Sequence, residues 1–214
     1  MKVVIFDMDG TLIDSARDIT ATINHVRLIN HGLEPLSSEE VVEIINRPVR
    51  NLAKLFYGTE NYETRDKVLF ESHYYDQCTQ NPQLYPGIDE LLATLFVSGV
   101  KLSVATNAPS LFACRMLSHL GILERFDHVV GPDTVGASKP DPEMLHHILK
   151  NYGFDYGKHH AWMVGDNQKD MDAARHAGIG ALYATWGFTS EAQGDEILAS
   201  PLRILEIVFP SQEI

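Results

Sequence analysis

The 214-residue sequence has few cysteines, no long apolar run and too little positive charge to balance its acidic residues. Its two cysteines, Cys78 and Cys114, lack metal-ligand spacing. They therefore predict reduced thiols rather than a disulfide framework or a zinc site. No segment approaches the roughly 20 apolar residues of a membrane-spanning helix. The apolar run before Asp7 is also too short for a signal peptide, so we expect a cytoplasmic protein with no membrane partner.

The charge balance excludes a further class of partner. The 17 lysines and arginines stand against 29 acidic residues, which gives a formal net charge of -12. Such a surface disfavours nucleic-acid backbones and anionic membranes. The 44% hydrophobic content allows a proper core, either as one domain with a sizeable insertion or as two small domains.

The N-terminal stretch MKVVIFDMDGT places two carboxylates directly after a short apolar run. The run Val3–Phe6 is β-branched and aromatic, which predicts a strand covered on both faces of a parallel sheet. Asp7 and Asp9 follow it, and like charges so close together resist ionising. A cation would remove that repulsion. The alternative is an ordinary turn, in which Asp and Gly are common, and this stretch alone leaves both interpretations open.

The segment that follows predicts helices only. Apolar residues recur at helical spacing after Ser15, and a capping-box pattern of Ser37 and Glu40 opens a second helix. Shorter helical patterns continue to Thr79, and the prolines at 82 and 86 close the segment. We therefore expect an all-helical insertion over residues 15–85.

The remaining sequence alternates between strand and helix patterns, which predicts a parallel sheet with right-handed crossovers. The fold class is therefore α/β, with a doubly wound core formed by residues 1–14 and 86–214. The expected strands after the first are 101–106, 128–130, 161–164 and 179–184. The expected helices are 88–97, one beginning near Pro109, one opening with Asp141 as its N-cap and Pro142 as its first residue, 169–177 and 201–208.

Polar residues follow four of the expected core strands or lie in the loops after them. These residues are Asp7 and Asp9, Thr106 and Asn107, Lys139, and Asp166 with Asp170. Open parallel sheets form their sites beyond the carboxyl ends of the strands, where the strand order reverses. With the strand order 3-2-1-4-5 the reversal lies between strands one and four, so we expect Asp7 to face Asp166.

These motifs, in this order, resemble those of the haloacid dehalogenase superfamily of phosphotransferases. The matching signatures are Asp7-Met8-Asp9-Gly10-Thr11, Thr106-Asn107, Lys139-Pro140, and Gly165-Asp166 with Asp170. The resemblance implies a Rossmann-like core with an inserted helical cap that selects the substrate. It also implies Mg²⁺-dependent hydrolysis of a small phosphorylated metabolite through an aspartyl-phosphate.

The resemblance also assigns roles to the acidic residues. Asp7 is the expected nucleophile, and its side chain, the Asp166 side chain and the Asp9 backbone carbonyl are the expected Mg²⁺ ligands. The Asp9 side chain is expected to protonate the leaving oxygen and later to deprotonate the attacking water. Asp170 is expected to support the metal through water or to hold Lys139.

The remaining core motifs are expected to serve the phosphoryl group. Thr106 and Lys139 would hold its oxygens and offset their charge. Gly10 would let the backbone turn close to the phosphate. Thr11 and Asn107 complete their motifs as supporting residues.

Two positions bear on the subclass within this resemblance. Asp9 argues against dehalogenation, because a dehalogenase has no phosphate leaving group to protonate. Mutases with this cap usually read Gly-Val after the second aspartate and carry a histidine in the first cap helix, where this sequence has Gly10-Thr11 and Ile19. The first motif and residues 126–142 look most like phosphoglycolate phosphatases.

Three alternatives stay open. One is a β-phosphoglucomutase-like phosphosugar mutase, and another is a 5′-nucleotidase on the same scaffold. The third is a catalytically silent binding or regulatory protein. The sequence also leaves a monomer and a homodimer open.

Substrate choice would depend on the helical insertion, whose specificity loop is expected near residues 45–50. Arg47 and Arg50 could bind a second anion, such as the carboxylate of glycolate. The alternative is that both are solvated charges at helix ends, which is the default for exposed arginines.

Overall fold

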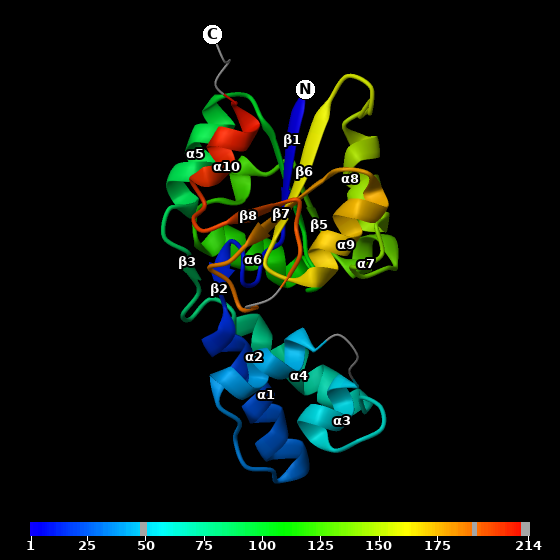
Figure 1. Ribbon diagram of the computed structural model, residues 1–214. Coiled ribbons are helices and arrows are strands. Elements are labelled where there is room, and N and C mark those ends of the chain that lie inside the picture. Colours follow the sequence, from blue (N-terminus) through cyan, green and yellow to red (C-terminus); the bar gives the residue numbers. More distant parts are fainter. Residues whose placement is uncertain (48–50, 190–191, 211–214) are drawn as a thin grey trace. The chain divides into compact units, whose positions relative to one another are not determined.

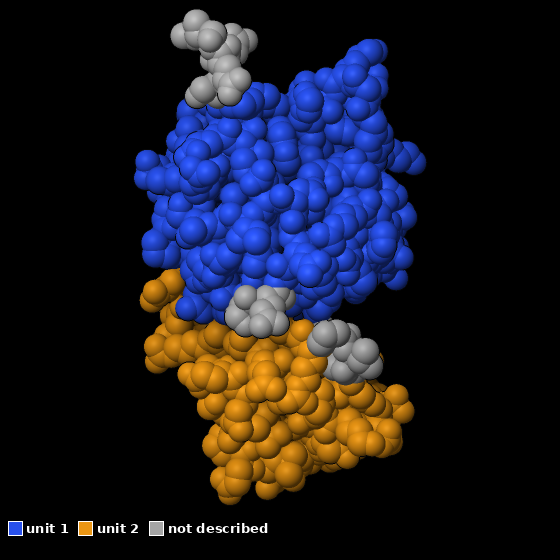
Figure 2. All heavy atoms as spheres, viewed as in Figure 1, with its two compact units in different colours: residues 1–14, 84–214 blue, residues 15–83 orange. Residues whose placement is uncertain are grey.

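A computed structural model describes residues 1–47, 51–189 and 192–210. The chain forms two compact units, shown in different colours in Figure 2. One comprises Met1–Asp14 and Leu84–Ile214, and the other comprises Ser15–Gln83. The second boundary lies two residues before the expected one. Among the described residues, no helix combines the length and the apolar character needed to cross a membrane.

The larger unit is built on a six-stranded parallel sheet (Figure 1). Across the sheet the strands are β5 (His128–Val130), β4 (Lys101–Ala105), β1 (Lys2–Phe6), β6 (His160–Gly165), β7 (Gly180–Ala184) and β8 (Glu196–Leu198). The first five of these have the predicted order 3-2-1-4-5, so the doubly wound α/β fold is confirmed. The edge strand β8 was missed in the sequence analysis.

The strand β1 lies where the strand order reverses. Val4 pairs with Leu102 of β4 on one side and with Trp162 of β6 on the other. Because all three strands run in the same direction, their carboxyl ends meet at one edge of the sheet. This edge holds the residues that follow Phe6, Ala105 and Gly165.

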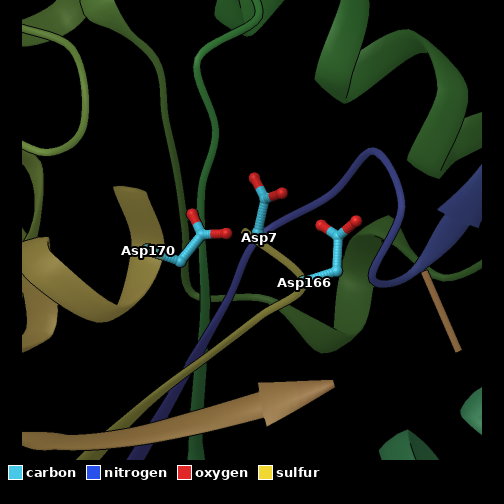
Figure 3. Close-up of side chains that lie close together, drawn as sticks. All are labelled: Asp7, Asp166 and Asp170. Atoms are coloured by element: carbon cyan, nitrogen blue, oxygen red, sulfur yellow. The ribbon is translucent and has the colours of Figure 1, made fainter. Parts of the chain in front are cut away.

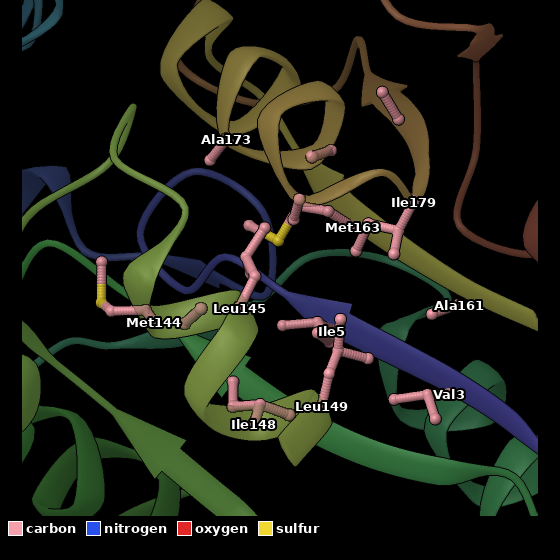
Figure 4. Close-up of a cluster of buried hydrophobic side chains, with 14 of the residues drawn as sticks. Val3, Ile5, Met144, Leu145, Ile148, Leu149, Ala161, Met163, Ala173 and Ile179 are labelled. Carbon is pink, nitrogen blue, oxygen red and sulfur yellow. The ribbon is translucent and has the colours of Figure 1, made fainter. Parts of the chain in front are cut away.

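Helices cover both faces of this sheet. They are α5 (Ile88–Val97), α6 (Ser110–His119), the 3₁₀ turn η1 (Leu123–Arg125), α7 (Pro132–Val135), α8 (Glu143–Asn151), α9 (Gln168–Ala177) and α10 (Arg203–Val208). On one face, Val3 and Ile5 of β1 share a core cluster with Leu145 and Leu149 of α8 (Figure 4). Since side chains alternate along a strand, the buried Val4 and Phe6 point to the other face. Burying each such side chain contributes roughly 1.5–3 kcal/mol.

One helix start differs from the prediction. The helix α8 begins at Glu143 and Pro142 precedes it, so Pro142 is not its first residue. Asp141 nevertheless contacts the N-terminus of α8, because its Oδ1 accepts a hydrogen bond from the Glu143 backbone N–H at 2.9 Å.

The smaller unit contains α1 (Ala16–His31), α2 (Ser38–Asn46), α3 (Leu52–Tyr57) and α4 (Thr64–Gln77). The predicted capping box is present, with the Glu40 N–H donating to Ser37 Oγ and the Ser37 N–H to Glu40 Oε2. Two short strands escaped prediction, β2 (Ile13–Asp14) and β3 (Gln83–Leu84), which pair with each other where the chain passes between the units.

Candidate active site

Three buried carboxylates gather at the carboxyl edge of the sheet (Figure 3). Asp7 directly follows β1, Asp166 directly follows β6, and Asp170 lies in the first turn of α9. One side-chain oxygen from each lies within 4.8 Å of the other two. The expected approach of Asp7 and Asp166 across the point of strand reversal is therefore present.

A single buried lysine sits among these acids. Lys139 Nζ lies 2.6 Å from Asp7 Oδ1 and 2.6 Å from Asp170 Oδ1, and it also donates to the Ala105 carbonyl at 2.7 Å. Burial lowers the pKa of Lys139, but the charges of Asp170 and Asp7 outweigh burial and raise the pKa above its ordinary value. The ammonium is therefore held in its charged form, and Asp170 contacts it directly.

The cluster nevertheless has more acidic than basic groups, because it contains three carboxylates and one ammonium, which contacts two of them. Burial, followed by the charges of Asp7 and Asp170, raises the pKa of Asp166. Burial also raises the pKa of Asp170, although Lys139 opposes it. A divalent cation would relieve this repulsion, and carboxylate oxygens are the ligands that Mg²⁺ prefers. The donor set therefore fits Mg²⁺.

Close packing fixes the Asp166 carboxylate. Its Oδ1 accepts a hydrogen bond from Thr11 Oγ1 at 3.3 Å, and its Oδ2 accepts one from the Phe188 backbone N–H at 2.7 Å. Gly10 has φ +88°, and a Cβ at that position would lie 2.4 Å from Asp166 Oδ2. Only glycine satisfies both the backbone angle and the space.

Asn107 joins two loops at the same edge. Its Nδ2 donates to the Lys139 carbonyl at 3.1 Å, and its Oδ1 accepts from the Lys139 N–H at 2.8 Å. This reciprocal pair holds the loop that carries Lys139 against the end of β4. Thr106 is also buried there, and its Oγ1 accepts a hydrogen bond from the Ala108 N–H at 3.0 Å.

Asp9 is not one of the three grouped carboxylates. It forms an isolated bridge with Ile13 in the turn after β1. Burial, followed by the charges of Asp14, Asp166 and Asp9, raises the pKa of Tyr85.

Of the two arginines predicted to bind substrate, Arg47 lies among the described residues of the helical unit. Arg47 is exposed at the end of α2 and forms an ion pair with Glu43 at 2.8 Å. Arg50 lies outside the described residues. Their predicted anion contact stays a prediction.

The sequence analysis named no site residue in the loop after β7. Gly187 packs so closely that an added Cβ would lie 2.2 Å from the Gly10 carbonyl oxygen and 2.4 Å from Asp166 Cβ. The neighbouring Trp186 Nε1 donates to the Thr11 carbonyl at 3.0 Å. The signal in the sequence was that this loop follows the fifth core strand. Loops that follow parallel strands all lie at the carboxyl edge of the sheet, where the site is.

A family model described as "Haloacid dehalogenase-like hydrolase" matches residues 4–184. The chain belongs to this family. The match begins within β1 and includes the turn after it, β4 and β6, and so covers every residue of the carboxylate cluster.

Named relatives of this family cover most of the chain. The N-acetylmuramic acid 6-phosphate phosphatase of Pseudomonas aeruginosa is 33% identical over 191 residues, which span 88% of this chain and 83% of that protein. The phosphoglycolate phosphatase of Aquifex aeolicus is 34% identical over 188 residues, spanning 88% and 86%. A crystal structure titled "a predicted phosphoglycolate phosphatase" from Haemophilus somnus superposes with a TM-score of 0.83 at 26% identity, covering 97% of each chain.

Proposed function

We propose that this phosphatase is a Mg²⁺-dependent hydrolase of small phosphomonoesters that works through an aspartyl-phosphate on Asp7. The observation that carries the proposal is the buried group of Asp7, Asp166 and Asp170 around Lys139 at the carboxyl edge of the sheet. Both named relatives are phosphatases, and each matches most of the chain. A binding protein without catalysis would not need such a strained buried cluster.

The proposed metal ligands are the side chains of Asp7 and Asp166 and the backbone carbonyl of Asp9. Bound there, Mg²⁺ would offset the repulsion between the carboxylate of Asp7 and the phosphate of the substrate. Asp170 acts beside this set by holding Lys139, which it contacts at 2.6 Å.

The protein residues then divide the chemistry between them. Asp7 attacks phosphorus, so an Asp7–phosphorus bond forms while the ester bond to the leaving oxygen breaks. Asp9 gives its proton to that oxygen. Asp9 next takes a proton from a water molecule, and the resulting hydroxide attacks the acyl phosphate, which frees inorganic phosphate and restores Asp7. Lys139 and Thr106 donate hydrogen bonds to the phosphoryl oxygens and stabilise their charge.

The proposed substrate is a small phosphate ester that also carries a carboxylate. Phosphoglycolate and N-acetylmuramic acid 6-phosphate, which name the relatives, share this chemistry. We assign the helical unit, with Arg47 and Arg50, the role of a cap that binds the second anion. The proposed compartment is the cytoplasm, where the thiols of Cys78 and Cys114 would stay reduced.

Hydrolysis of an aryl phosphate tests the reaction. We expect turnover with Mg²⁺, none with excess EDTA, and a loss of at least about a thousandfold in Asp7→Asn, because the covalent step needs the carboxylate. Asp172→Asn is the matched control, since Asp172 lies on α9 and pairs with Arg175 away from the cluster. Turnover in Asp7→Asn, or turnover indifferent to EDTA, contradicts the mechanism.

A paired kinetic measurement tests the proposed substrate class. We expect Arg47→Ala and Arg50→Ala to raise the KM for phosphoglycolate roughly tenfold. The KM for an aryl phosphate that carries no carboxylate should stay unchanged, because only phosphoglycolate loses a charged hydrogen bond to its second anion. Arg65→Ala is the control, as Arg65 is an exposed arginine of the same unit that pairs with Glu63. An unchanged KM for phosphoglycolate in both variants would show that the two arginines are solvated surface charges that do not bind this substrate.

A further inference from the structure

The loop after β7 reaches the proposed metal site through three successive residues. Trp186 donates from its indole Nε1 to the Thr11 carbonyl at 3.0 Å. Gly187 fits against the Gly10 carbonyl and Asp166, where a Cβ has no room. Phe188 donates its backbone N–H to Asp166 Oδ2 at 2.7 Å. The loop therefore contacts both the turn after β1 and the carboxylate after β6.

These contacts determine the orientation of one carboxylate. Asp166 Oδ2 is held by Phe188, and Asp166 Oδ1 is held by the Thr11 hydroxyl at 3.3 Å. The Thr11 backbone is in turn held by the indole of Trp186. Trp186 therefore acts on Asp166 indirectly, through Thr11, which contacts the Asp166 carboxylate.

The loop can serve as a fixed support because both of its ends are attached. At the start, the Thr185 N–H and Oγ1 both donate to the Leu198 carbonyl of β8, each at 3.0 Å. At the end, Tyr183 donates its hydroxyl to the Thr189 carbonyl at 2.7 Å, and Asn167 Nδ2 donates to Thr189 Oγ1 at 3.2 Å. The edge strand β8 thus acquires a role, since it anchors the loop that bears Trp186.

We propose that Trp186 is a positioning residue for Mg²⁺ binding, which holds Thr11 so that the Thr11 hydroxyl and the Phe188 N–H together orient Asp166 toward the ion. The inference rests on the proposed function. Groups that orient a metal ligand without touching the metal commonly change affinity or activity by about 10–100-fold when they are removed.

Calorimetric titration with MgCl₂ in the absence of substrate measures this directly. Trp186→Phe keeps an aromatic ring and removes the N–H donor, and we expect it to weaken Mg²⁺ binding about tenfold. Saturating Mg²⁺ should then restore kcat. Trp162→Phe is the matched control, because Trp162 is also half-buried but packs against His160 and Gly180 within the sheet. It should leave the Kd unchanged.

A double-mutant cycle separates positioning from a general loss of packing. Thr11→Val removes the hydroxyl but keeps the carbonyl that accepts from Trp186. If Trp186 acts through Thr11, adding Trp186→Phe to Thr11→Val should weaken Mg²⁺ binding less than twofold further. Additive tenfold losses overturn the proposal.

A spectroscopic readout keeps Trp186 in place. The chain has two tryptophans, so Trp162→Phe leaves Trp186 as the only indole fluorophore. Its emission should change during the MgCl₂ titration with the calorimetric Kd, and an unchanged emission overturns the proposal. If Asp166→Asn binds Mg²⁺ as well as the natural protein does, the proposed function fails. If Asp166→Asn abolishes Mg²⁺ binding but Trp186→Phe binds Mg²⁺ as tightly as the natural protein does, the proposed function stands and only this inference fails.

Discussion

At the scale of single residues, Gly10 is the position where backbone angle and close approach act together. Its φ of +88° excludes most side chains, and the space for a Cβ is taken by Asp166. Gly136 offers a matched comparison, because it has φ +80° but nothing within 4 Å of an added Cβ. Both substitutions by alanine carry a backbone penalty of roughly 1–2 kcal/mol.

We expect Gly10→Ala to lose at least about a hundredfold in kcat/KM for an aryl phosphate, because the added Cβ displaces the carboxylate of Asp166, a proposed metal ligand. Gly136→Ala should lose comparable stability in urea while keeping its activity. Steady-state kinetics beside urea unfolding of the two variants checks both expectations. Equal activity in the two variants would mean that the contact between Gly10 and Asp166 is not needed for catalysis.

At the scale of elements, α1 and α4 are joined through a buried acid. Asp66 is 1% exposed, and its Oδ1 accepts from Asn30 Nδ2 at 2.9 Å and lies 2.8 Å from His31 Nε2. Burial raises the pKa of Asp66, but the hydrogen bonds from Asn30 and His31 outweigh burial and lower it. A lowered pKa means that the charged carboxylate stabilises the fold above the unfolded-state pKa of about 3.9.

That stabilisation should vanish as the pH falls through the lowered pKa. Asp66→Asn is therefore expected to lose about 2 kcal/mol of unfolding free energy at pH 7, the usual size of a hydrogen bond to a charged group. The loss should shrink below about pH 4. Urea unfolding followed by the helical circular dichroism signal, at pH 7 and pH 3, measures this difference. Glu71→Gln, on the exposed face of α4, should change neither value, and an equal loss at both pH values contradicts the charge argument.

The elements also show how far the sequence could predict this fold. Five of the six sheet strands and the helix starts after Ser15 and Ser37 follow from local patterns, because buried strands are mostly apolar and capping residues recur. The strand β8 has three residues, two of them exposed, so no apolar pattern marks it. The pair β2 and β3 has two residues in each strand. Such strands form only because tertiary contacts bring them together.

The same distinction holds in the candidate site. Asp7, Asp166 and Asp170 could be placed together because the carboxyl ends of parallel strands share one edge. The contact between Trp186 and Thr11 could not, because it joins residues far apart in the sequence through an indole with no motif around it. Close approaches such as Gly187 against Gly10 depend on how neighbouring loops pack, which local sequence does not encode.

At the scale of the whole molecule, the carboxylate cluster sets a balance between stability and function. All three acids belong to the unit formed by Met1–Asp14 and Leu84–Ile214. Their mutual repulsion opposes folding of that unit until a cation neutralises it. Mg²⁺ is therefore expected to raise the melting temperature, because a ligand that binds only the native state stabilises it by mass action.

At a concentration a hundredfold above its Kd, Mg²⁺ should add about 2.7 kcal/mol, or roughly 5–10 °C for a chain of this size. Asp166→Asn should differ from the natural protein both in its metal-free melting temperature and in its response to Mg²⁺. It removes one of three clustered charges, so the metal-free variant should melt higher than the natural protein, and it removes a ligand, so Mg²⁺ should add little. Calorimetric melting of both proteins with EDTA and with MgCl₂ gives the four values. Asp172→Asn, which leaves the cluster intact, should retain the full shift with Mg²⁺. The opposite result would be a metal-free Asp166→Asn protein that melts lower than the natural one. It would show that the Asp166 carboxylate stabilises the fold without a metal, and the buried charge of this site would then be no argument for a bound cation.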